Sequence, residues 1–214
     1  MQCVLGVDGG NTKTVALVAA LDGTILGAGR GGCGDIYNAR PGGDWTASAA
    51  AAIANIEFAV VSALQAAQVK ASDLVTSVFN MAGADWPEDF GLLQDAMELR
   101  GFGRTILIQN DALGVLHAGS SDNTGVSVVC GTGAATGARG PDGRTWHSSR
   151  WQDQVQGSTH LAQKTLDAVY RSQLGIFTAL EAAEVAIDDA LLGNLIPTIP
   201  APTLFATALH LSGR

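Results

Sequence analysis

The sequence predicts an α/β protein of two related lobes, the second of them incomplete. The first supporting observation is the order of expected elements, which runs three strands, helix, strand, helix, strand, helix. The second is an internal repeat. A strand, a glycine turn, a second strand, an Asp-Gly hairpin and a third strand open the chain and recur from residue 125. We therefore expect one lobe at 1–110 and a partial, helix-ending lobe at 111–214.

The first lobe opens with three strands, expected at 2–8, 14–21 and 24–29. The first is a short apolar run rich in β-branched residues, which is typical of a buried strand, and Asp22-Gly23 is a hairpin signal between the second and third. A glycine-rich loop from Gly31 to Gly43 follows. These features predict an antiparallel meander.

The remaining elements of this lobe alternate helix and strand. Asp44 is a suitable N-cap for a helix whose apolar residues keep helical spacing as far as Ala67. Pro87 opens a second helix, which we expect to end near Arg100. The strands are expected at 74–81 and 105–109, and a short helix at 112–119.

The second lobe repeats the opening pattern and then becomes helical. Strands are expected at 125–130 and 134–140, joined by the turn Gly131-Thr132-Gly133, and Pro141-Asp142-Gly143 is the second hairpin signal. After Gly157-Ser158 we expect only helices, at 159–174, 178–193 and 202–211.

Composition excludes several classes of function. A net charge of −8 without a basic cluster argues against a nucleic-acid partner. The cysteines (Cys3, Cys33 and Cys130) are far apart and lack zinc or redox spacing, which favours reduced thiols in a cytoplasmic protein. No signal peptide is evident at the N-terminus. The apolar stretch near Ala49 is interrupted by Asn55 and Glu57, so we expect no membrane span.

The turn after the first strand carries the pattern with most chemical content, Asp8-Gly9-Gly10-Asn11-Thr12-Lys13-Thr14. Glycines let backbone N–H groups approach phosphate oxygens, and a carboxylate at a strand end can hold Mg²⁺, which prefers oxygen ligands. A tight hairpin that uses Asp and Gly only for turn geometry explains the same residues. Recurrence of a glycine turn in the second lobe favours the phosphate hypothesis.

Gly27 to Gly32 match the G-x-G-x-x-G pattern of dinucleotide-binding proteins. They follow a hairpin strand and open a loop, whereas that function requires a glycine turn that opens a helix. We do not expect a dinucleotide site here.

Four segments stand in order over about residues 3–170: Asp8–Thr14, Asn110-Asp111-Ala112, Cys130–Gly133, and Trp151 with Gly157-Ser158. They resemble, in this order, the first phosphate motif, the catalytic-aspartate motif, the second phosphate motif and the sugar-binding segment of the sugar kinase, Hsp70 and actin ATPase superfamily, which has a ribonuclease H-like fold. Within it, the chain is most similar to the N-acetylglucosamine kinase and BadF/BadG/BcrA/BcrD ATPase branch.

The resemblance implies ATP-dependent, Mg²⁺-dependent phosphorylation of an amino sugar at its 6-hydroxyl. Asp8 would hold the metal, and Asp111 would be the general base. ATP would be bound by the residues of the two glycine turns (Gly9, Gly10, Asn11, Thr12, Lys13, Gly131, Thr132 and Gly133). The sugar would contact Asn38, Gly83, Asp111 and Trp151. From the residues alone, Asp111 is also a suitable N-cap for the helix at 112–119.

Two departures from the family pattern bear on function. The acidic doublet that usually precedes Gly-Ser in the sugar segment reads Val155-Gln156, and the adenosine motif that follows in the family is absent from the later sequence. A partner chain, for example in a homodimer, would complete the second lobe. Alternative functions are a BadF-type ATPase or activator module and a non-catalytic nucleotide- or sugar-binding relative.

Overall fold

The computed structural model describes residues 1–151 and 157–175. The helices expected at 178–193 and 202–211, and the departure at Val155-Gln156, lie outside the described residues. Contacts between residues divide the chain into two compact units, one formed by Met1–Val129 and Ala135–Gln152, the other by Cys130–Ala134 and Asp153–Arg214. This division does not follow the boundary expected at 110/111, so the assignment of lobes stays a prediction.

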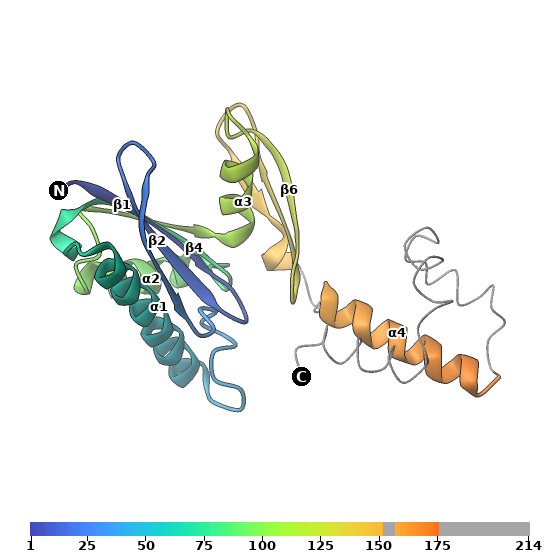
Figure 1. Cartoon of the computed structure of the whole chain (residues 1–214). Helices are drawn as coiled ribbons and strands as arrows, with labels where there is room; N and C mark the ends of the chain where they lie inside the picture. Colours follow the sequence, from blue (N-terminus) through green and yellow to red (C-terminus); the bar gives the residue numbers. More distant parts are fainter. Residues whose placement is uncertain (152–156, 176–214) are drawn as a thin grey trace. The chain divides into compact units, whose positions relative to one another are not determined.

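Five strands form the main sheet of the first unit, in the order β3-β2-β1-β4-β5 (Figure 1). They are β1 (Cys3–Gly9), β2 (Thr14–Ala20), β3 (Ile25–Gly31), β4 (Leu74–Met81) and β5 (Thr105–Asn110). The first three pair antiparallel, as predicted, whereas β1, β4 and β5 are mutually parallel. Parallel strands bring their carboxyl ends to one edge of the sheet, and that edge positions the site described below.

Helices begin where the sequence places them. In α1 (Trp45–Ala67), the Asp44 carboxylate accepts the Ala47 N–H at 2.7 Å, which confirms the predicted N-cap. Pro87 is the first residue of α2 (Pro87–Leu99), and α3 (Asp111–Gly119) follows β5 directly. A 3-10 turn (η1, Ala71–Asp73) precedes β4. Helix α1 contacts β2 and β3, α2 contacts β5, and α3 contacts β1, β4 and β5.

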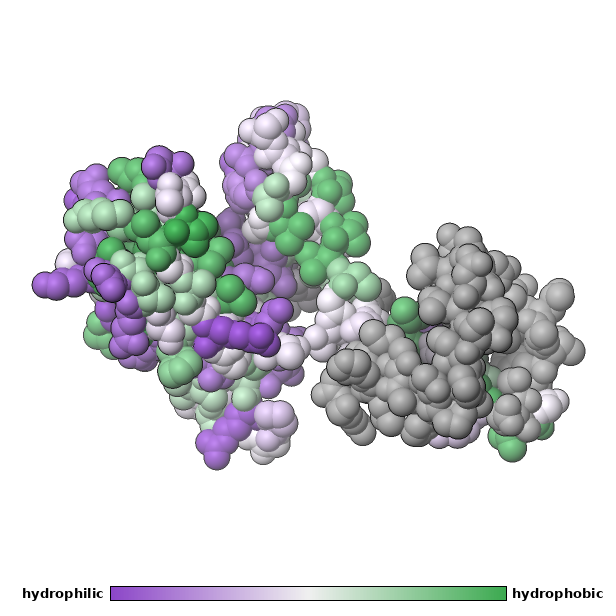
Figure 2. Space-filling view, viewed as in Figure 1, coloured by the Kyte–Doolittle hydropathy of each residue, from purple (hydrophilic) through white to green (hydrophobic). Residues whose placement is uncertain are grey.

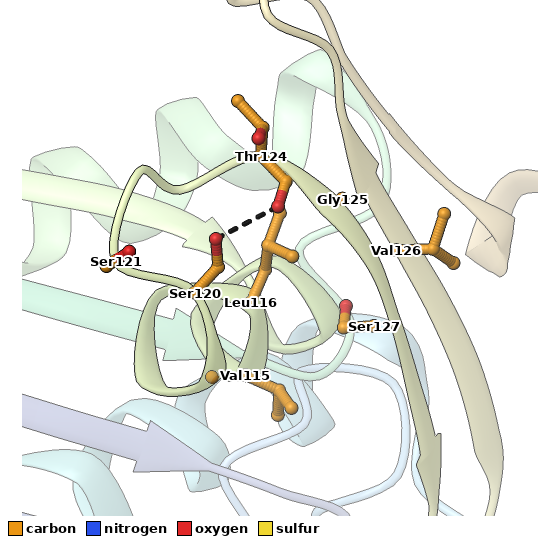
Figure 3. A pocket seen from close by; sticks show the side chains of 9 residues that line it. Val115, Leu116, Ser120, Ser121, Thr124, Gly125, Val126 and Ser127 are labelled. Atoms are coloured by element: carbon orange, nitrogen blue, oxygen red, sulfur yellow. Dashed lines mark hydrogen bonds between the residues drawn. The ribbon is translucent and has the colours of Figure 1, made fainter.

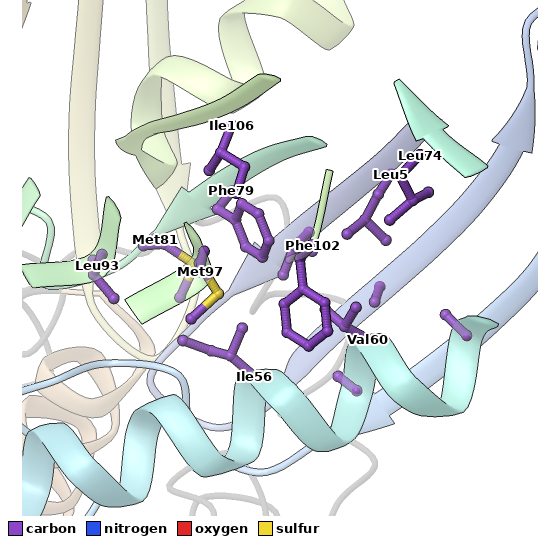
Figure 4. Close-up of a cluster of buried hydrophobic side chains, with 14 of the residues drawn as sticks. Leu5, Ile56, Val60, Leu74, Phe79, Met81, Leu93, Met97, Phe102 and Ile106 are labelled. Carbon is purple, nitrogen blue, oxygen red and sulfur yellow. The ribbon is translucent and has the colours of Figure 1, made fainter. Parts of the chain in front are cut away.

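One face of the sheet and helix α1 enclose the hydrophobic core (Figure 4). Along β1, Cys3, Leu5 and Val7 are buried and alternate with less buried residues, as expected of a strand with one covered face. Phe79 and Ile56 are fully buried in the same cluster. Helix α1 is long and apolar enough to span a membrane by length and composition alone, but the buried side chains of this helix belong to that cluster.

The glycines of β3 allow α1 to lie directly against the strand. A Cβ at Gly27 would be 2.4 Å from the Ala67 nitrogen, and one at Gly29 would be 2.0 Å from the Ala59 carbonyl oxygen. These contacts are with helix backbone, so no side-chain rotation relieves them. Close packing therefore accounts for the G-x-G-x-x-G pattern and for the extension of β3 to Gly31, beyond the expected end at residue 29.

The predicted repeat is confirmed in the second sheet, which consists of β6 (Gly125–Cys130), β7 (Ala134–Arg139) and β8 (Thr145–His147) in that order. The two Asp-Gly hairpins have equivalent hydrogen bonds. Gly23 N–H donates to the Ala20 carbonyl at 3.0 Å, and Gly143 N–H donates to the Gly140 carbonyl at 3.0 Å. A 3-10 turn (η2, Ser148–Trp151) and helix α4 (Ser158–Gln173) complete the described elements.

Candidate functional site

Three of the predicted site residues lie where parallel strands end. Asp8 is the penultimate residue of β1, Gly83 follows β4, and Asp111 follows β5. The strand register aligns Asp8 with Asn80 of β4, and Asn80 with Gln109 of β5. The carboxyl edge of a parallel sheet is where α/β proteins commonly bind ligands.

The face that carries Asp8 is the face on which α3 lies. Asn80 donates to the Val7 carbonyl at 3.3 Å and accepts from the Gln109 amide at 2.7 Å. A Cβ at Gly114 of α3 would be 2.4 Å from Cγ of Asn80, so the helix approaches this polar row closely. The helix that begins with Asp111 therefore packs on the same side of the sheet as Asp8.

The start of α3 corrects one sequence-based alternative. Asn110, not Asp111, is the N-cap, because the fully buried Asn110 side chain accepts the Ala112 N–H at 3.1 Å. Asp111 is the first helical residue, and its own carboxylate accepts the same N–H at 2.9 Å. Asn is a preferred N-cap because its oxygen accepts a backbone N–H, and a helix N-terminus favours the negative charge of Asp111 in the first turn. Because Asn110 caps α3, the Asp111 carboxylate is not required as the N-cap and is compatible with the predicted role of a base.

Asp85 joins the turn after β4 to the start of α3. Its Oδ1 accepts the Asn110 side-chain amide at 3.1 Å, and its carboxylate also receives a hydrogen bond from Ser149 of η2. Ser149 in turn accepts from the Asn110 amide at 3.3 Å. Trp151, expected to line a sugar pocket, is the exposed last residue of η2, the turn that Ser149 ties to Asn110.

Asp35 brings together two of the predicted sugar ligands. Its Oδ2 accepts the Asn38 side-chain amide at 2.8 Å, and its Oδ1 accepts the Tyr37 N–H at 2.8 Å. Gly83 has a φ of +80°, and a Cβ there would be 2.5 Å from Asp35 Oδ1. The Asp35 carboxylate is buried, whereas Asn38 is exposed beside it. The glycine at 83 is therefore required both by its backbone conformation and by this carboxylate.

Asp89 fixes the entry to α2 next to these groups. Its carboxylate accepts the N–H groups of Asp85 and Trp86 at 3.1 and 2.8 Å, and the Tyr37 hydroxyl at 2.8 Å. Burial and the bond to Asp89 raise the pKa of Tyr37, so this phenol stays protonated as the donor. The loop after β3 and the turn after β4 are thus held together by hydrogen bonds to buried carboxylates.

Burial, together with the charges of neighbouring carboxylates, raises the pKa of two acids at this edge of the sheet. Burial raises the pKa of Asp111, the Ala112 N–H opposes this effect, and the charges of Asp8 and Asp35 add to it. Burial likewise raises the pKa of Asp85 to about 6, against the hydrogen bond from Ser149, with further increases from Asp35, Asp89 and Asp111. A carboxylate with a raised pKa is a stronger base once it is ionised.

The raised pKa of Asp85 should make the free energy of unfolding depend on pH. An unfolded Asp has a pKa of 3.8 and folded Asp85 one of about 6, so between these values the folded state binds more protons. The free energy of unfolding therefore falls as pH rises through this window. The amide in Asp85→Asn does not ionise, so the variant should lack part of this fall in stability. We therefore expect the melting temperature of Asp85→Asn, relative to that of wild type, to be higher at pH 6.5 than at pH 4. Thermal melts at both pH values test this, and a constant difference would contradict it.

The first glycine turn has the geometry of a closed hairpin. Gly10 N–H donates to the Lys13 carbonyl at 2.9 Å, and the Gly10 carbonyl accepts from Gly34 N–H at 2.9 Å. Asn11, Thr12 and Lys13 are exposed, whereas Thr14 is buried and donates to the Gly32 carbonyl at 2.9 Å. A Cβ at Gly9 would be 2.1 Å from the Met81 side chain. A side chain at Gly9 would have to displace the buried end of Met81, and the exposed part of the turn is Asn11 to Lys13.

The second glycine turn belongs to the second unit and is tied to the start of α4. Gly131 N–H donates to the Gly133 carbonyl at 2.8 Å, and Ser158 N–H donates to the Gly131 carbonyl at 2.9 Å. Gly157 has a φ of +92°, and a Cβ there would be 2.5 Å from the Gly133 carbonyl carbon and oxygen. The predicted motifs Gly131–Gly133 and Gly157-Ser158 therefore contact each other. A shared grip on one triphosphate by both turns stays a prediction.

A separate pocket of about 510 Å³ lies at the far end of α3 from Asp111 (Figure 3). It is lined by Val115 and Leu116 of α3, by Ser120 and Thr124 of the following loop, and by the start of β6. Hydrophobic residues also gather on the surface around β6 (Figure 2), where Val126 and Val128 are largely exposed. None of the predicted site residues lines this pocket, so it is not the candidate site.

The carboxylates at this edge of the sheet fit Mg²⁺ only together with a nucleotide. In the described part of the chain, His, Cys, Asp and Glu form no group of three or more that could hold a metal by itself. Mg²⁺ is usually held by one or two carboxylates together with substrate phosphates. The negative charges of Asp8 and Asp35 raise the pKa of Asp111, and a bound divalent cation would offset that increase. The residues fit a metal that arrives with its nucleotide.

Sequence reasoning missed the residues that organise the site. The sequence alone assigns no role to Asp35, Asp85, Asn110 and Ser149, although Asp85 stands two residues after the predicted sugar contact Gly83. The signal for Asp85 and Asn110 is their position, because polar side chains that follow neighbouring parallel strands lie at one edge of the sheet. For Ser149 no such signal exists, since it lies 39 residues from its partner Asn110.

Two solved structures share this fold. A candidate N-acetylglucosamine kinase from Chromobacterium violaceum aligns with a TM-score of 0.61 and 21% identity, covering 99% of this chain and 73% of that one. A second from Porphyromonas gingivalis aligns with a TM-score of 0.59 and 17% identity, covering 98% and 76%. The fold is therefore the α/β ATPase fold of sugar kinases and actin, as the sequence predicts.

Comparison of sequences identifies the family of the chain within this fold class. A model of the BadF/BadG/BcrA/BcrD ATPase family matches residues 5–145, which include both glycine turns and Asp111, and the chain belongs to this family. It is also 26% identical over 151 residues to an N-acetylmuramic acid/N-acetylglucosamine kinase from Clostridium acetobutylicum, covering 71% of this chain and 47% of that kinase. The chain thus spans about half the length of this relative.

Proposed function

We propose that the chain carries the catalytic half of an ATP-dependent amino-sugar kinase that phosphorylates N-acetylglucosamine or a related sugar at its 6-hydroxyl. The observation that carries this proposal is the placement of Asp111. It stands at the carboxyl edge of the parallel strands, on the Asp8 side of the sheet, with a raised pKa and its helix already capped by Asn110. Family membership and the C. acetobutylicum relative support the same reaction class.

In this mechanism each group of the chain has a separate task. Asp111 accepts the proton of the acceptor hydroxyl as that oxygen attacks the terminal phosphorus of ATP. The exposed residues Asn11 to Lys13 would donate hydrogen bonds to the phosphates, and Thr132 with its flanking glycines is the predicted second phosphate motif. Mg²⁺, held by Asp8, would neutralise charge on the transferred phosphoryl group. Phosphoryl transfer needs this positioning and charge neutralisation more than covalent chemistry.

The sugar would lie against the loops that Asp35 joins. Asn38 presents an exposed amide whose Nδ2 is already directed to Asp35, so its Oδ1 remains as an acceptor for a sugar hydroxyl. Gly83 supplies close backbone approach, and Trp151 an exposed aromatic surface. A homodimer that completes the second lobe and a cytoplasmic location stay predictions.

A BadF-type ATPase that hydrolyses ATP without a sugar is the alternative that the family description favours. Activators of that kind need clustered cysteines for an iron–sulfur centre. Here Cys3 is buried, Cys33 partly buried and Cys130 exposed, and all three are free thiols. The distribution of cysteines therefore favours the kinase.

ADP release, measured with a coupled enzyme assay, tests the proposed function. N-acetylglucosamine, N-acetylmuramic acid, glucosamine and glucose serve as acceptors, and a reaction without sugar is the control. We expect Mg²⁺-dependent ADP release that requires an amino sugar. Release that is equal without sugar would support the ATPase instead, and retained nucleotide binding with no release would support a non-catalytic relative.

A further inference from the structure

The amide of Asn110 is an unusually constrained group. It is fully buried, and its nitrogen donates to Asp85 Oδ1 at 3.1 Å, to the Ala84 carbonyl at 3.3 Å and to Ser149 Oγ at 3.3 Å. Its oxygen caps α3 through the Ala112 N–H. Asn110 thus connects the turn after β4, the start of α3 and the turn after β8.

Asp85 is the dominant partner in this set. It makes the shortest of the three contacts with the Asn110 nitrogen, and only it carries charge, which strengthens a hydrogen bond. Asp85 also receives a hydrogen bond from Ser149, which itself accepts from Asn110, so the three side chains close a triangle. Truncating Asp85 leaves a buried amide with only its longer, neutral contacts.

The position of the Asp111 carboxylate depends on this arrangement. The Ala112 N–H is shared between Asn110 and Asp111, at 3.1 and 2.9 Å. If the Asn110 side chain rotates away, this N–H bonds to Asp111 alone, and the first turn of α3 loses its cap. Both changes move the carboxylate that the proposed function uses as a base.

We propose that Asp85 is a positioning residue that holds Asp111 in place through Asn110. The inference rests on the proposed function, because it names what orients the base of that reaction. It assigns Asp85 no contact with substrate. The groups that face Asp85 are Asn110 and Asp111 at the start of α3, Ser149 of η2, Asp35 of the loop after β3 and Asp89 of α2.

Three variants of the 214-residue chain separate positioning from general destabilisation. Asp85→Ala removes the acceptor. Asp85→Asn keeps an oxygen for the Asn110 amide and turns its own amide toward the Ser149 hydroxyl, which can accept. Asp44→Ala is the matched control, because it removes a cap of comparable kind at α1, which carries none of the site residues.

We expect Asp85→Ala to lower kcat at least about tenfold with the KM for the sugar changed less than about threefold, because a small misplacement of a catalytic group costs rate more than binding. Asp85→Asn should keep most of the activity, and Asp44→Ala should keep kcat. Asn110→Ala should resemble Asp85→Ala, and the double variant should be no worse than either single one. Additive losses, or equal losses in Asp85→Ala and Asp85→Asn, would overturn the proposal.

Hydrogen exchange of the Ala112 amide, measured by NMR without substrates, gives a readout that does not depend on kinase activity. We expect exchange to be at least about tenfold faster in Asp85→Ala and unchanged in Asp85→Asn. Unchanged exchange in Asp85→Ala would refute the coupling even in an active enzyme. An inactive wild-type chain would refute the proposed function, and the exchange result would still decide whether Asp85 holds the start of α3.

Discussion

Asp111→Asn is expected to reduce sugar-dependent ADP release about 10²- to 10⁴-fold in kcat, the usual contribution of a general base. The amide cannot accept the proton of the acceptor hydroxyl, yet its oxygen can still accept the Ala112 N–H as the carboxylate does at 2.9 Å. Because Asn110 is the N-cap of α3, the substitution should not unfold the helix. We therefore expect the melting temperature to be unchanged or raised, since a neutral side chain replaces a partly buried charge.

Asp95→Asn is the matched control for this experiment, because Asp95 is an exposed residue of α2 that is not among the charges acting on Asp111. Steady-state kinetics with the best amino sugar give kcat and KM for wild type and both variants. Retention of more than about one tenth of wild-type kcat in Asp111→Asn would contradict the role of Asp111 as base, given the usual size of that effect.

The sequence predicts elements well where one local signal dominates. Asp44 and Pro87 mark the starts of α1 and α2, and the two Asp-Gly pairs mark hairpins with equivalent hydrogen bonds. The sequence predicts that β3 ends at residue 29 and that Gly31 opens a loop, whereas the strand extends to Gly31. Contact of Gly31 with the backbone of α1, which only the tertiary structure shows, accounts for the difference.

The site is harder to predict because its chemistry depends on contacts between distant segments. A carboxylate at position 111 is a base or a cap according to what its neighbour does, and the neighbour Asn110 is held by Asp85, which is 25 residues away. Likewise, the sequence places Asn38 in a loop, but only the contact with Asp35 gives its amide an orientation. Sequence motifs predict which residues contact substrate, whereas the residues that orient them are found from the geometry of the structure.

Gly157→Ala is the substitution we expect to disrupt the proposed second phosphate motif most directly. Its Cβ would lie 2.5 Å from the carbonyl carbon and oxygen of Gly133, and the backbone there has a φ of +92°. Neither problem is relieved by a side-chain rotation. Overpacking costs about 1–3 kcal/mol, and a left-handed conformation costs a residue with a Cβ roughly 1–2 kcal/mol more. The turn Gly131–Gly133 and the start of α4 must therefore separate or shift.

Because that turn is proposed to bind ATP phosphates, we expect Gly157→Ala to weaken ATP binding at least about tenfold, the equivalent of 1.4 kcal/mol. Isothermal titration calorimetry with a non-hydrolysable ATP analogue and Mg²⁺ measures this. Gly143→Ala is the matched control, since Gly143 has a φ of +81° but open space around its Cβ position. It separates backbone strain from the contact with Gly133. An equal loss in both variants, or wild-type affinity in Gly157→Ala, would show that the packing of α4 on this turn does not govern nucleotide binding.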